Sequence, residues 1–211
     1  MKKAKKFRAI GEAGFLESWG KGDFFTKLSL LVPGLGNIRR GQIVKGILFL
    51  LLGLAYGIYF FGTGLKVLSK LPTLGTKTQE KVWDDAQGIF VYEPGDNSLL
   101  ILLSGVIFVF LTLAFLLFLR MAVRSAYYAE ELSRAGRRVP DFREEIEKHF
   151  NGRLHRTLLF LPVLGVLVFT ILPLVFMISM AFTNYDRDHQ VPGKLFTWVG
   201  LENFRTVLDF D

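Results

Sequence analysis

The chain has 211 residues, 51% of them hydrophobic, and a formal net charge of +7 at pH 7. With 21 Phe and a positive mean hydropathy, its composition departs from that of ordinary soluble domains and favours a membrane protein. The lack of cysteine excludes disulfides, thiolate nucleophiles and cysteine-ligated metals.

Residues 1–45 form a basic segment, and the first long apolar run begins too far from the N-terminus for a secretory signal peptide. Aromatic residues among the basic ones suit the lipid headgroup region, and a disordered basic arm is the alternative. The stretch "GNIRRGQI" has the glycine spacing of a phosphate-binding loop, but Gln42 and Ile43 stand where Lys and Ser/Thr are required. We therefore expect a turn in which Arg39, Arg40 and Lys45 contact headgroups.

Three apolar runs contain no Asp, Glu, Lys, Arg or His: residues 46–65, 99–119 and 158–182. Each is close to or above the roughly 20 residues that cross a bilayer core about 30 Å thick. Buried helices of soluble proteins are usually shorter and carry a polar stripe. The predicted fold is an all-α integral membrane protein with three transmembrane helices, the first holding Gly53 and Gly57 at a spacing that permits close helix packing.

The region from 120 to 157 is predicted to begin as a continuation of the second helix, which ends near Gly136. A separate short helix follows, with Asp141 and Glu144 as a capping box and Asn151–Gly152 as its end. Its apolar residues recur at four-residue intervals: Phe142, Ile146 and Phe150. This apolar stripe is expected to face either the bilayer interface or a cytoplasmic partner.

The third run contains two prolines, Pro162 and Pro173. We expect Pro162 in the first turn or so of the helix, where a missing N–H leaves least unsatisfied. Pro173 lies mid-span and frees the carbonyl of Phe169, a defect that neighbouring helices, water or the nearby Thr170 can compensate in a membrane. A kink at Pro173 therefore predicts that this helix packs against other protein.

The distribution of Lys and Arg predicts the orientation. They are concentrated in residues 1–45 and in the region 120–157, so these segments are placed in the cytoplasm and Asp211 outside. Four regions result: a basic cytoplasmic or interfacial segment (1–45), a two-helix transmembrane extension (46–119), a cytoplasmic loop with a short helix (120–157), and a last region with the third helix and an extracytoplasmic segment (158–211).

The runs contain no ionisable residue, so ion coupling within them is not expected. The histidines His149, His155 and His189 are scattered without metal-ligand spacing, and no catalytic motif is present. We predict no catalytic, cofactor-binding or metal-binding residues, and a protein that is not an enzyme. A lipid-modifying membrane enzyme is disfavoured because the ends of the runs lack catalytic acids and histidines.

The last quarter of the chain resembles a known family. "LFLPVLGVLVFTILPLVFMISMAFTNYD", followed by "FTWVGLENFRTVLDFD", is similar to the opening of the conserved region of binding-protein-dependent ABC sugar-importer permeases. The matching residues are Leu161, Pro162, Pro173, Leu174, Ala181, Phe182, Thr183, Tyr185 and the extracytoplasmic motif Val199, Gly200, Leu201, Glu202, Asn203 and Phe204. Ala181 departs from the Ser that is frequent in the family. Two preceding transmembrane helices and "EPGDNSLLILLSGVI" resemble the maltose/maltodextrin (MalF-like) branch.

This resemblance implies a permease subunit of an ATP-driven oligosaccharide importer in the bacterial plasma membrane. Its implied partners are a second permease subunit, two ATPase subunits, an extracellular sugar-binding protein and membrane lipids, with no nucleic acid. The family's ATPase-docking loop, E-A-A-x-x-x-G, does not occur in these residues, so we expect an N-terminal portion of a longer permease. The alternative is a free-standing three-span scaffold that recruits a cytoplasmic partner.

Overall fold

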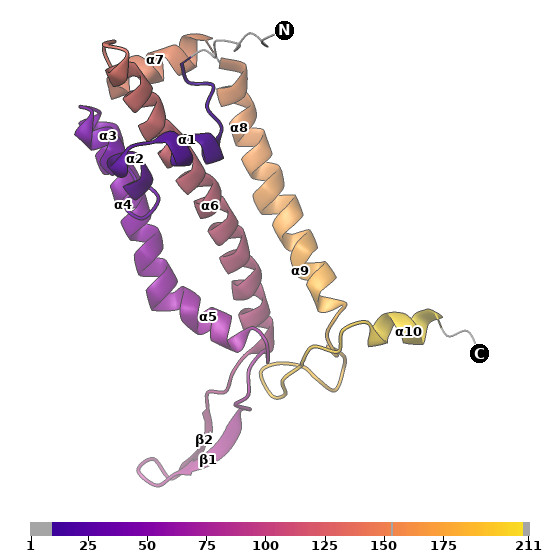
Figure 1. The fold of residues 1–211 in the computed structure, drawn as a ribbon. Helices are drawn as coiled ribbons and strands as arrows, with labels where there is room; N and C mark the ends of the chain where they lie inside the picture. Colours follow the sequence, from indigo (N-terminus) through magenta and orange to yellow (C-terminus); the bar gives the residue numbers. More distant parts are fainter. Residues whose placement is uncertain (1–9, 153, 209–211) are drawn as a thin grey trace. The chain divides into compact units, whose positions relative to one another are not determined.

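The computed structural model describes residues 10–152 and 154–208, without the side chains of residues 148–157. The protein is mostly helical, as predicted (Figure 1). The α-helices are α1 (Phe15–Lys21), α2 (Phe24–Leu28), α3 (Leu35–Arg39), α4 (Ile43–Tyr59), α5 (Leu65–Lys70), α6 (Ser98–Arg134), α7 (Phe142–Gly152), α8 (Leu154–Val166), α9 (Leu172–Met180) and α10 (Glu202–Leu208). Two π-helical segments, η1 (Phe60–Gly64) and η2 (Leu167–Ile171), and two strands, β1 (Glu80–Asp84) and β2 (Ile89–Glu93), complete the elements.

Three helical stretches are long and apolar enough to cross a membrane: Ile43–Lys70, Ser98–Arg134 and Leu158–Met180. They confirm the three predicted spans, here called the first, second and third span. The first is longer than its uncharged run because η1 and α5 continue it to Lys70. The second continues as predicted to a left-handed Gly136, with φ +66°.

The chain divides into two compact units: residues 1–59 with 112–160, and residues 60–111 with 161–211. In the first unit, aromatic side chains join the first two spans. The rings of Phe49 and Phe118 meet edge to face with centroids 5.3 Å apart, and Tyr56 stacks on Phe115 at 3.8 Å. The Tyr56 hydroxyl also donates to Thr112 Oγ1 at 2.8 Å, so a polar group within the spans is satisfied by a neighbouring helix.

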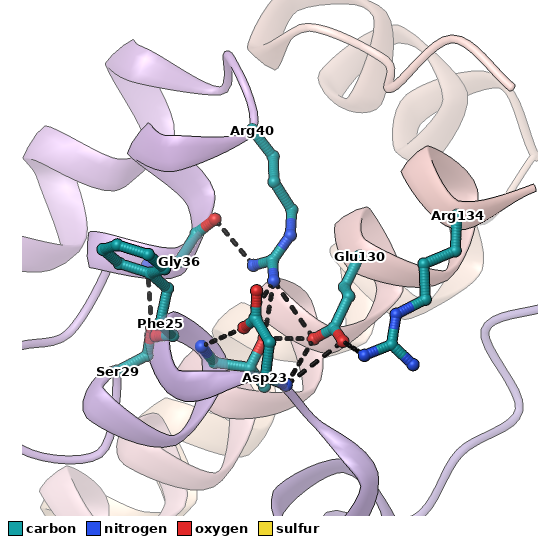
Figure 2. A network of polar contacts seen from close by, with 8 residues as sticks. Asp23, Phe25, Ser29, Gly36, Arg40, Glu130 and Arg134 are labelled. Atoms are coloured by element: carbon teal, nitrogen blue, oxygen red, sulfur yellow. Dashed lines mark hydrogen bonds and ion pairs between the residues drawn. The ribbon is translucent and has the colours of Figure 1, made fainter. Parts of the chain in front are cut away.

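The buried carboxylate of Glu130 joins α6 to the N-terminal helices (Figure 2). Its Oε2 accepts hydrogen bonds from Thr26 Oγ1 at 2.6 Å and from Arg40 Nη2 at 3.1 Å. Both carboxylate oxygens accept from the Asp23 N–H at 3.1 Å, and Arg134 pairs with Oε1 one helical turn later. Since a buried charge is tolerated only when it is paired and hydrogen-bonded, Glu130 fixes the position of α2 and of the α3 end on α6.

Arg40 is the cation of this network, and its side chain is only 6% exposed. It pairs with Asp23 Oδ1 at 2.7 Å and donates to the Gly36 carbonyl at 2.8 Å. The Gly36 N–H donates to Ser29 Oγ, which in turn donates to the Phe25 carbonyl. The expectation that Arg40 contacts headgroups is therefore wrong, because the fold brings two carboxylates to it.

Lys45 is also paired within the protein, against the same expectation. Its Nζ lies 2.5 Å from Glu145 Oε2 on α7, and both side chains are less than one fifth exposed. Gln42 donates to Glu145 Oε1 and to the Pro140 carbonyl, each at 2.8 Å. The bonds of Lys45 and Gln42 dock α7 on the start of the first span. The predicted capping box of α7, between Asp141 and Glu144, is confirmed.

A close backbone contact holds the turn before α3 against α4. Gly34 has φ +89°, and a Cβ there would lie 2.1 Å from the Gly46 carbonyl oxygen. A Cβ on Gly46 would come within 2.4 Å of the Ile38 side chain. Both positions need glycine, and this pair was not identified from the sequence.

The second unit has a small hydrophobic core of Leu74, Leu102 and Phe196, all at most 1% exposed. Its sheet is an addition to the predicted all-α fold. β1 and β2 pair antiparallel, with Trp83 opposite Phe90. Asp84 closes the turn by accepting from the N–H groups of Ala86 and Gln87. The alternating β-branched and aromatic residues of "KVWDDAQGIFVY" are the sequence signal for this hairpin.

Replacing the buried carboxylate tests how the N-terminal helices are held. We expect Glu130→Ala to lower stability by about 3 kcal/mol, since Arg40 is left buried without this partner. Limited trypsin digestion of the chain in nanodiscs should then cut within residues 10–42 much faster than in wild type. Glu147→Ala, at an exposed ion pair on α7, is the matched control. Equal cleavage rates in both variants would contradict the account.

The Asp23 carboxyl gives this contact a pH dependence. Partial burial acts to raise the pKa of Asp23, but hydrogen bonds from Thr26 and Arg40 hold it below its usual value. The stabilisation is therefore complete above the unfolded pKa, about 3.9, and is lost as the pH falls through the lower folded pKa. The stability advantage of wild type over Asp23→Asn should stay constant from about pH 7 to 5 and shrink below about pH 4. An advantage that does not change down to about pH 2.5 would contradict this assignment.

Candidate functional site

The third span contains a break in its α-helical hydrogen bonding just before Pro173. Residues Leu167–Ile171 are π-helical, and the Leu172 N–H donates to the Leu167 carbonyl. Pro173 lies in the first turn of α9, where its missing N–H is least damaging. Thr170 lies inside the π segment with an exposed side chain. A π segment beside a proline is a recognised cause of helix bending and is frequent at functional sites.

Pro162 lies inside α8 and not in its first turn, because the helix begins at Leu154, ahead of the apolar run. The expectation that Pro162 starts the helix is wrong for this reason: the helix extends into the more polar residues before the span. Pro162 therefore removes an internal hydrogen bond to the carbonyl of Leu158. The third span thus has proline defects both early in its length and at its middle.

The end of the third span is capped by a side chain from the sequence motif 199–204. Asn203 Nδ2 donates to the Ala181 carbonyl at 2.9 Å and to the Thr183 carbonyl at 2.8 Å. Thr183 Oγ1 donates to the Met180 carbonyl at 2.8 Å. The bonds to Met180 and Ala181 satisfy carbonyls that the end of a helix leaves without partners, and the bond to Thr183 fixes the residues that follow.

Main-chain bonds bring the motif back to the same helix end. The N–H groups of Val199 and Gly200 both donate to the Phe182 carbonyl, at 2.8 and 3.1 Å. Gly200 has φ +63°, a left-handed conformation that favours glycine and that turns the chain into α10. The ring of Phe204 packs on Phe182 with centroids 5.2 Å apart. The two motifs of the resemblance, 182–185 and 199–204, therefore form one hydrogen-bonded unit.

The segment before this motif also bonds to the ends of the other two spans. Trp198 Nε1 donates to the Leu71 carbonyl at 2.8 Å, directly after α5. The Phe196 N–H donates to Ser98 Oγ, at the first residue of α6, at 3.2 Å. We call residues 181–184 and 196–204, together with Leu71 and Ser98, the clasp. Within the second unit, the clasp ties one end of each of the three spans together.

An apolar groove of about 200 Å³ adjoins the clasp. Trp198 and Leu71 line it with residues of the second and third spans: Leu102, Gly105, Val106, Val109, Phe110, Val175 and Ser179. Ser179 Oγ is already bonded to the Val175 carbonyl at 2.7 Å. The lining has no ionisable group, so the groove suits an apolar chain or helix face and offers no acid–base chemistry.

Asp96 holds the loop that precedes the second span. It pairs with Lys70 at 2.6 Å and accepts from the N–H groups of Thr76 and Lys77. The hydrogen bond from Lys70, with those from the backbone, keeps the pKa of Asp96 far below its usual value. The carboxylate therefore remains charged at physiological pH and fixes both ends of the loop.

The structure brings some of the predicted site residues together and leaves others apart. Val199–Phe204 meet the end of the third span, whereas Pro162 and Thr170 lie along it. Gly53 packs on Pro33 of the N-terminal segment, since a Cβ added to Gly53 would lie 3.0 Å from the proline ring. A Cβ on Gly57 would have no neighbour within 4 Å. The role of Gly53 and Gly57 in helix packing stays a prediction. So does the role of Pro162, Thr170 and Pro173 as candidates for the structure of the third span and for a transport path.

Sequence reasoning did not single out Trp198, Ser98 or Glu130. None of the three had a local signal in the sequence, because their partners lie about 90 to 130 residues away. The Phe142–Phe150 stripe is described only in part. Phe142 is half-buried and Ile146 is 40% exposed, while the Phe150 side chain lies outside the described residues.

The chain is similar to bacterial sugar-transport permeases. It is 32% identical over 186 residues to the maltodextrin transport system permease protein MalC of Streptococcus pneumoniae, which is 86% of this chain and 39% of the relative. It is 30% identical over 183 residues to the galactooligosaccharides transport system permease protein GanP of Bacillus subtilis, covering 86% of this chain and 40% of that one. MdxF, a maltodextrin transport system permease protein of Bacillus subtilis, is 29% identical over 84% of this chain and 38% of its own length.

The chain therefore spans about two fifths of the length of the curated relatives it matches. No protein-family model matches it, and neither does any solved structure. The resemblance to sugar-importer permeases of the maltodextrin type is confirmed by these relatives, and it extends over most of the chain. Each relative is named as a permease protein. The three helices that are long and apolar enough to cross a membrane agree with the prediction of a multi-pass membrane protein.

Removing the donor group of Asn203 tests the clasp. Asn203→Asp keeps the shape of the side chain but offers no N–H when ionised, and it places a negative charge near a helix C-terminus. We expect a loss of about 1–3 kcal/mol in the stability of the second unit. Thermal unfolding in nanodiscs measures this loss, with Glu202→Gln as the neighbouring control. The same melting temperature in both variants would show that the cap contributes nothing.

Proposed function

We propose that this chain is part of the permease subunit of an ATP-driven ABC importer for oligosaccharides of the maltodextrin class. The observation that carries the proposal is the similarity over 86% of the chain to permeases named for maltodextrin and galactooligosaccharides. The clasp supports the proposal. Residues 199–204, which resemble the motif of sugar-importer permeases, cap the end of the third span through Asn203.

In this proposal the third span forms a wall of the sugar path or of the interface with a second permease subunit. The π segment and Pro173 interrupt its hydrogen bonding at the middle of the span. Such a break leaves a helix able to pack at two angles, which is what rocking of helix bundles around a central site requires. The clasp then keeps the extracytoplasmic ends of the spans together during that movement, as a cap.

The proposed partners are the second permease subunit, two ATPase subunits and an extracellular sugar-binding protein. The three apolar runs 46–65, 99–119 and 158–182 contain no Asp, Glu, Lys, Arg or His for ion coupling. Import driven by ATP hydrolysis in separate subunits agrees with this composition. The first two spans would act in packing and assembly.

The direct test is ATP-dependent uptake of labelled maltotetraose and of a galactooligosaccharide by proteoliposomes that hold the complete transporter and its binding protein. Omission of the subunit that carries this chain should abolish uptake of the transported sugar. ATP-dependent uptake that continues at the wild-type rate without the subunit would refute the proposal.

Pro173→Ala tests the role of the helix break. Alanine restores an N–H that can bond to the Phe169 carbonyl, so the π segment can return to a regular α-helix. We expect uptake in the complete transporter to fall by about threefold to tenfold, equivalent to roughly 0.7–1.4 kcal/mol, with membrane insertion intact. Pro162→Ala, earlier in the same span, is the matched control and should retain most uptake. Wild-type uptake by Pro173→Ala would count against the role of the break.

A further inference from the structure

The β1–β2 hairpin leaves three aromatic side chains about half exposed in the described structure. Trp83 is 49% exposed, Phe90 57% and Tyr92 60%. Figure 1 shows the hairpin extending beyond the adjoining ends of α5 and α6, away from those helices. In the predicted orientation this places it outside the membrane. Large aromatic surfaces left in water are unfavourable, and clusters of them mark binding sites.

These aromatic residues share one face of the hairpin. Trp83 stands opposite Phe90, and Lys81 stands opposite Tyr92. Because side chains two residues apart point to the same side of a strand, the four form one surface, here called the aromatic face. The Trp83 and Phe90 rings meet edge to face with centroids 4.9 Å apart, and Lys81 Nζ lies 4.9 Å from the Phe90 ring and 6.0 Å from the Tyr92 ring.

The hairpin is held in place at both ends. Asp84 caps the turn through two N–H groups, and Gly88 N–H donates to the Asp84 carbonyl at 2.8 Å. At the base, Lys77 pairs with Glu93 at 3.3 Å, and the Asp96 N–H donates to the Lys77 carbonyl at 2.7 Å. The aromatic face is therefore organised before any ligand arrives, which lowers the entropy lost on binding.

Charge distinguishes between possible ligands. Residues 80–93 carry four carboxylates, from Glu80, Asp84, Asp85 and Glu93, and one ammonium, from Lys81. This excess of negative charge opposes anionic lipid headgroups, which attract basic segments. A neutral sugar meets no such repulsion. Lys81, on the same face as the rings, can also donate hydrogen bonds to its hydroxyl groups.

We propose that the aromatic face of the hairpin binds the pyranose rings of a neutral oligosaccharide. Aromatic rings carry negative charge density on their faces, and the C–H groups of a pyranose ring present positive charge to them. Two or three adjacent sugar units can contact the rings of Trp83, Phe90 and Tyr92 in succession. The proposal rests on the proposed function for its sugar class, and it adds a contact site outside the membrane-spanning path.

Saturation-transfer NMR with maltoheptaose and the full 211-residue chain in neutral nanodiscs tests this site. We expect transfer to the ring C–H protons in wild type, and an affinity about tenfold weaker, equivalent to about 1.4 kcal/mol, in Trp83→Ile. Isoleucine keeps a high strand propensity, so the hairpin is retained while the ring is lost. Tyr92→Val is the second variant of the same kind. Val82→Ala and Val91→Ala, on the opposite face, are matched controls that should bind like wild type.

The outcomes separate this site from the proposed function. An absence of transfer in wild type, or equal transfer in wild type and both ring variants, overturns the site. If the complete transporter still imports sugar in either case, the proposed function stands. If Trp83→Ile weakens binding of the separate sugar-binding protein, or of anionic vesicles, and leaves sugar transfer unchanged, the face serves that partner and the sugar proposal is wrong. Ring-dependent transfer in a chain whose transporter imports no sugar would keep the site and refute the proposed function.

Discussion

Hydrogen bonds to the carbonyl groups at the ends of apolar helices are the constraint on which the second unit depends. No water reaches such groups inside a bilayer, so the protein must satisfy them at the boundary. Asn203, Trp198 and the N–H groups of Val199 and Gly200 do this for the first and third spans, and Ser98 receives the Phe196 N–H at the start of the second. A short loop segment thereby fixes where three helices end.

A different interaction holds the N-terminal segment. There the apolar runs have ended, and the polar part of α6 supplies Glu130 as a buried acceptor for Arg40, Thr26 and the Asp23 N–H. A buried ion pair of this kind contributes little net stability compared with apolar packing, but it permits a single arrangement of its partners. The N-terminal segment is in this way joined to the second span by a specific contact, in place of loose association with lipid.

Local signals in the sequence were sufficient for the three spans, the continuation to Gly136 and the capping box of α7, because each depends on neighbouring residues. The partners of Arg40 and Lys45 were not predictable in this way, since Glu130 and Glu145 lie about 90 to 100 residues along the chain. The sequence also identified residues 199–204 by resemblance, but only the structure shows Asn203 as a cap. The start of α8 was misplaced because the apolar run begins later than its helix.

Hydrogen–deuterium exchange of the chain in nanodiscs measures the clasp most directly. We expect the amides of Val199 and Gly200, although they lie in a loop, to exchange far more slowly than those of residues 186–190 in the same loop. Their protection should approach that of the last turn of α9, because both bond to the Phe182 carbonyl. Equally fast exchange across residues 186–200 would contradict the claim that this segment holds the ends of the three spans.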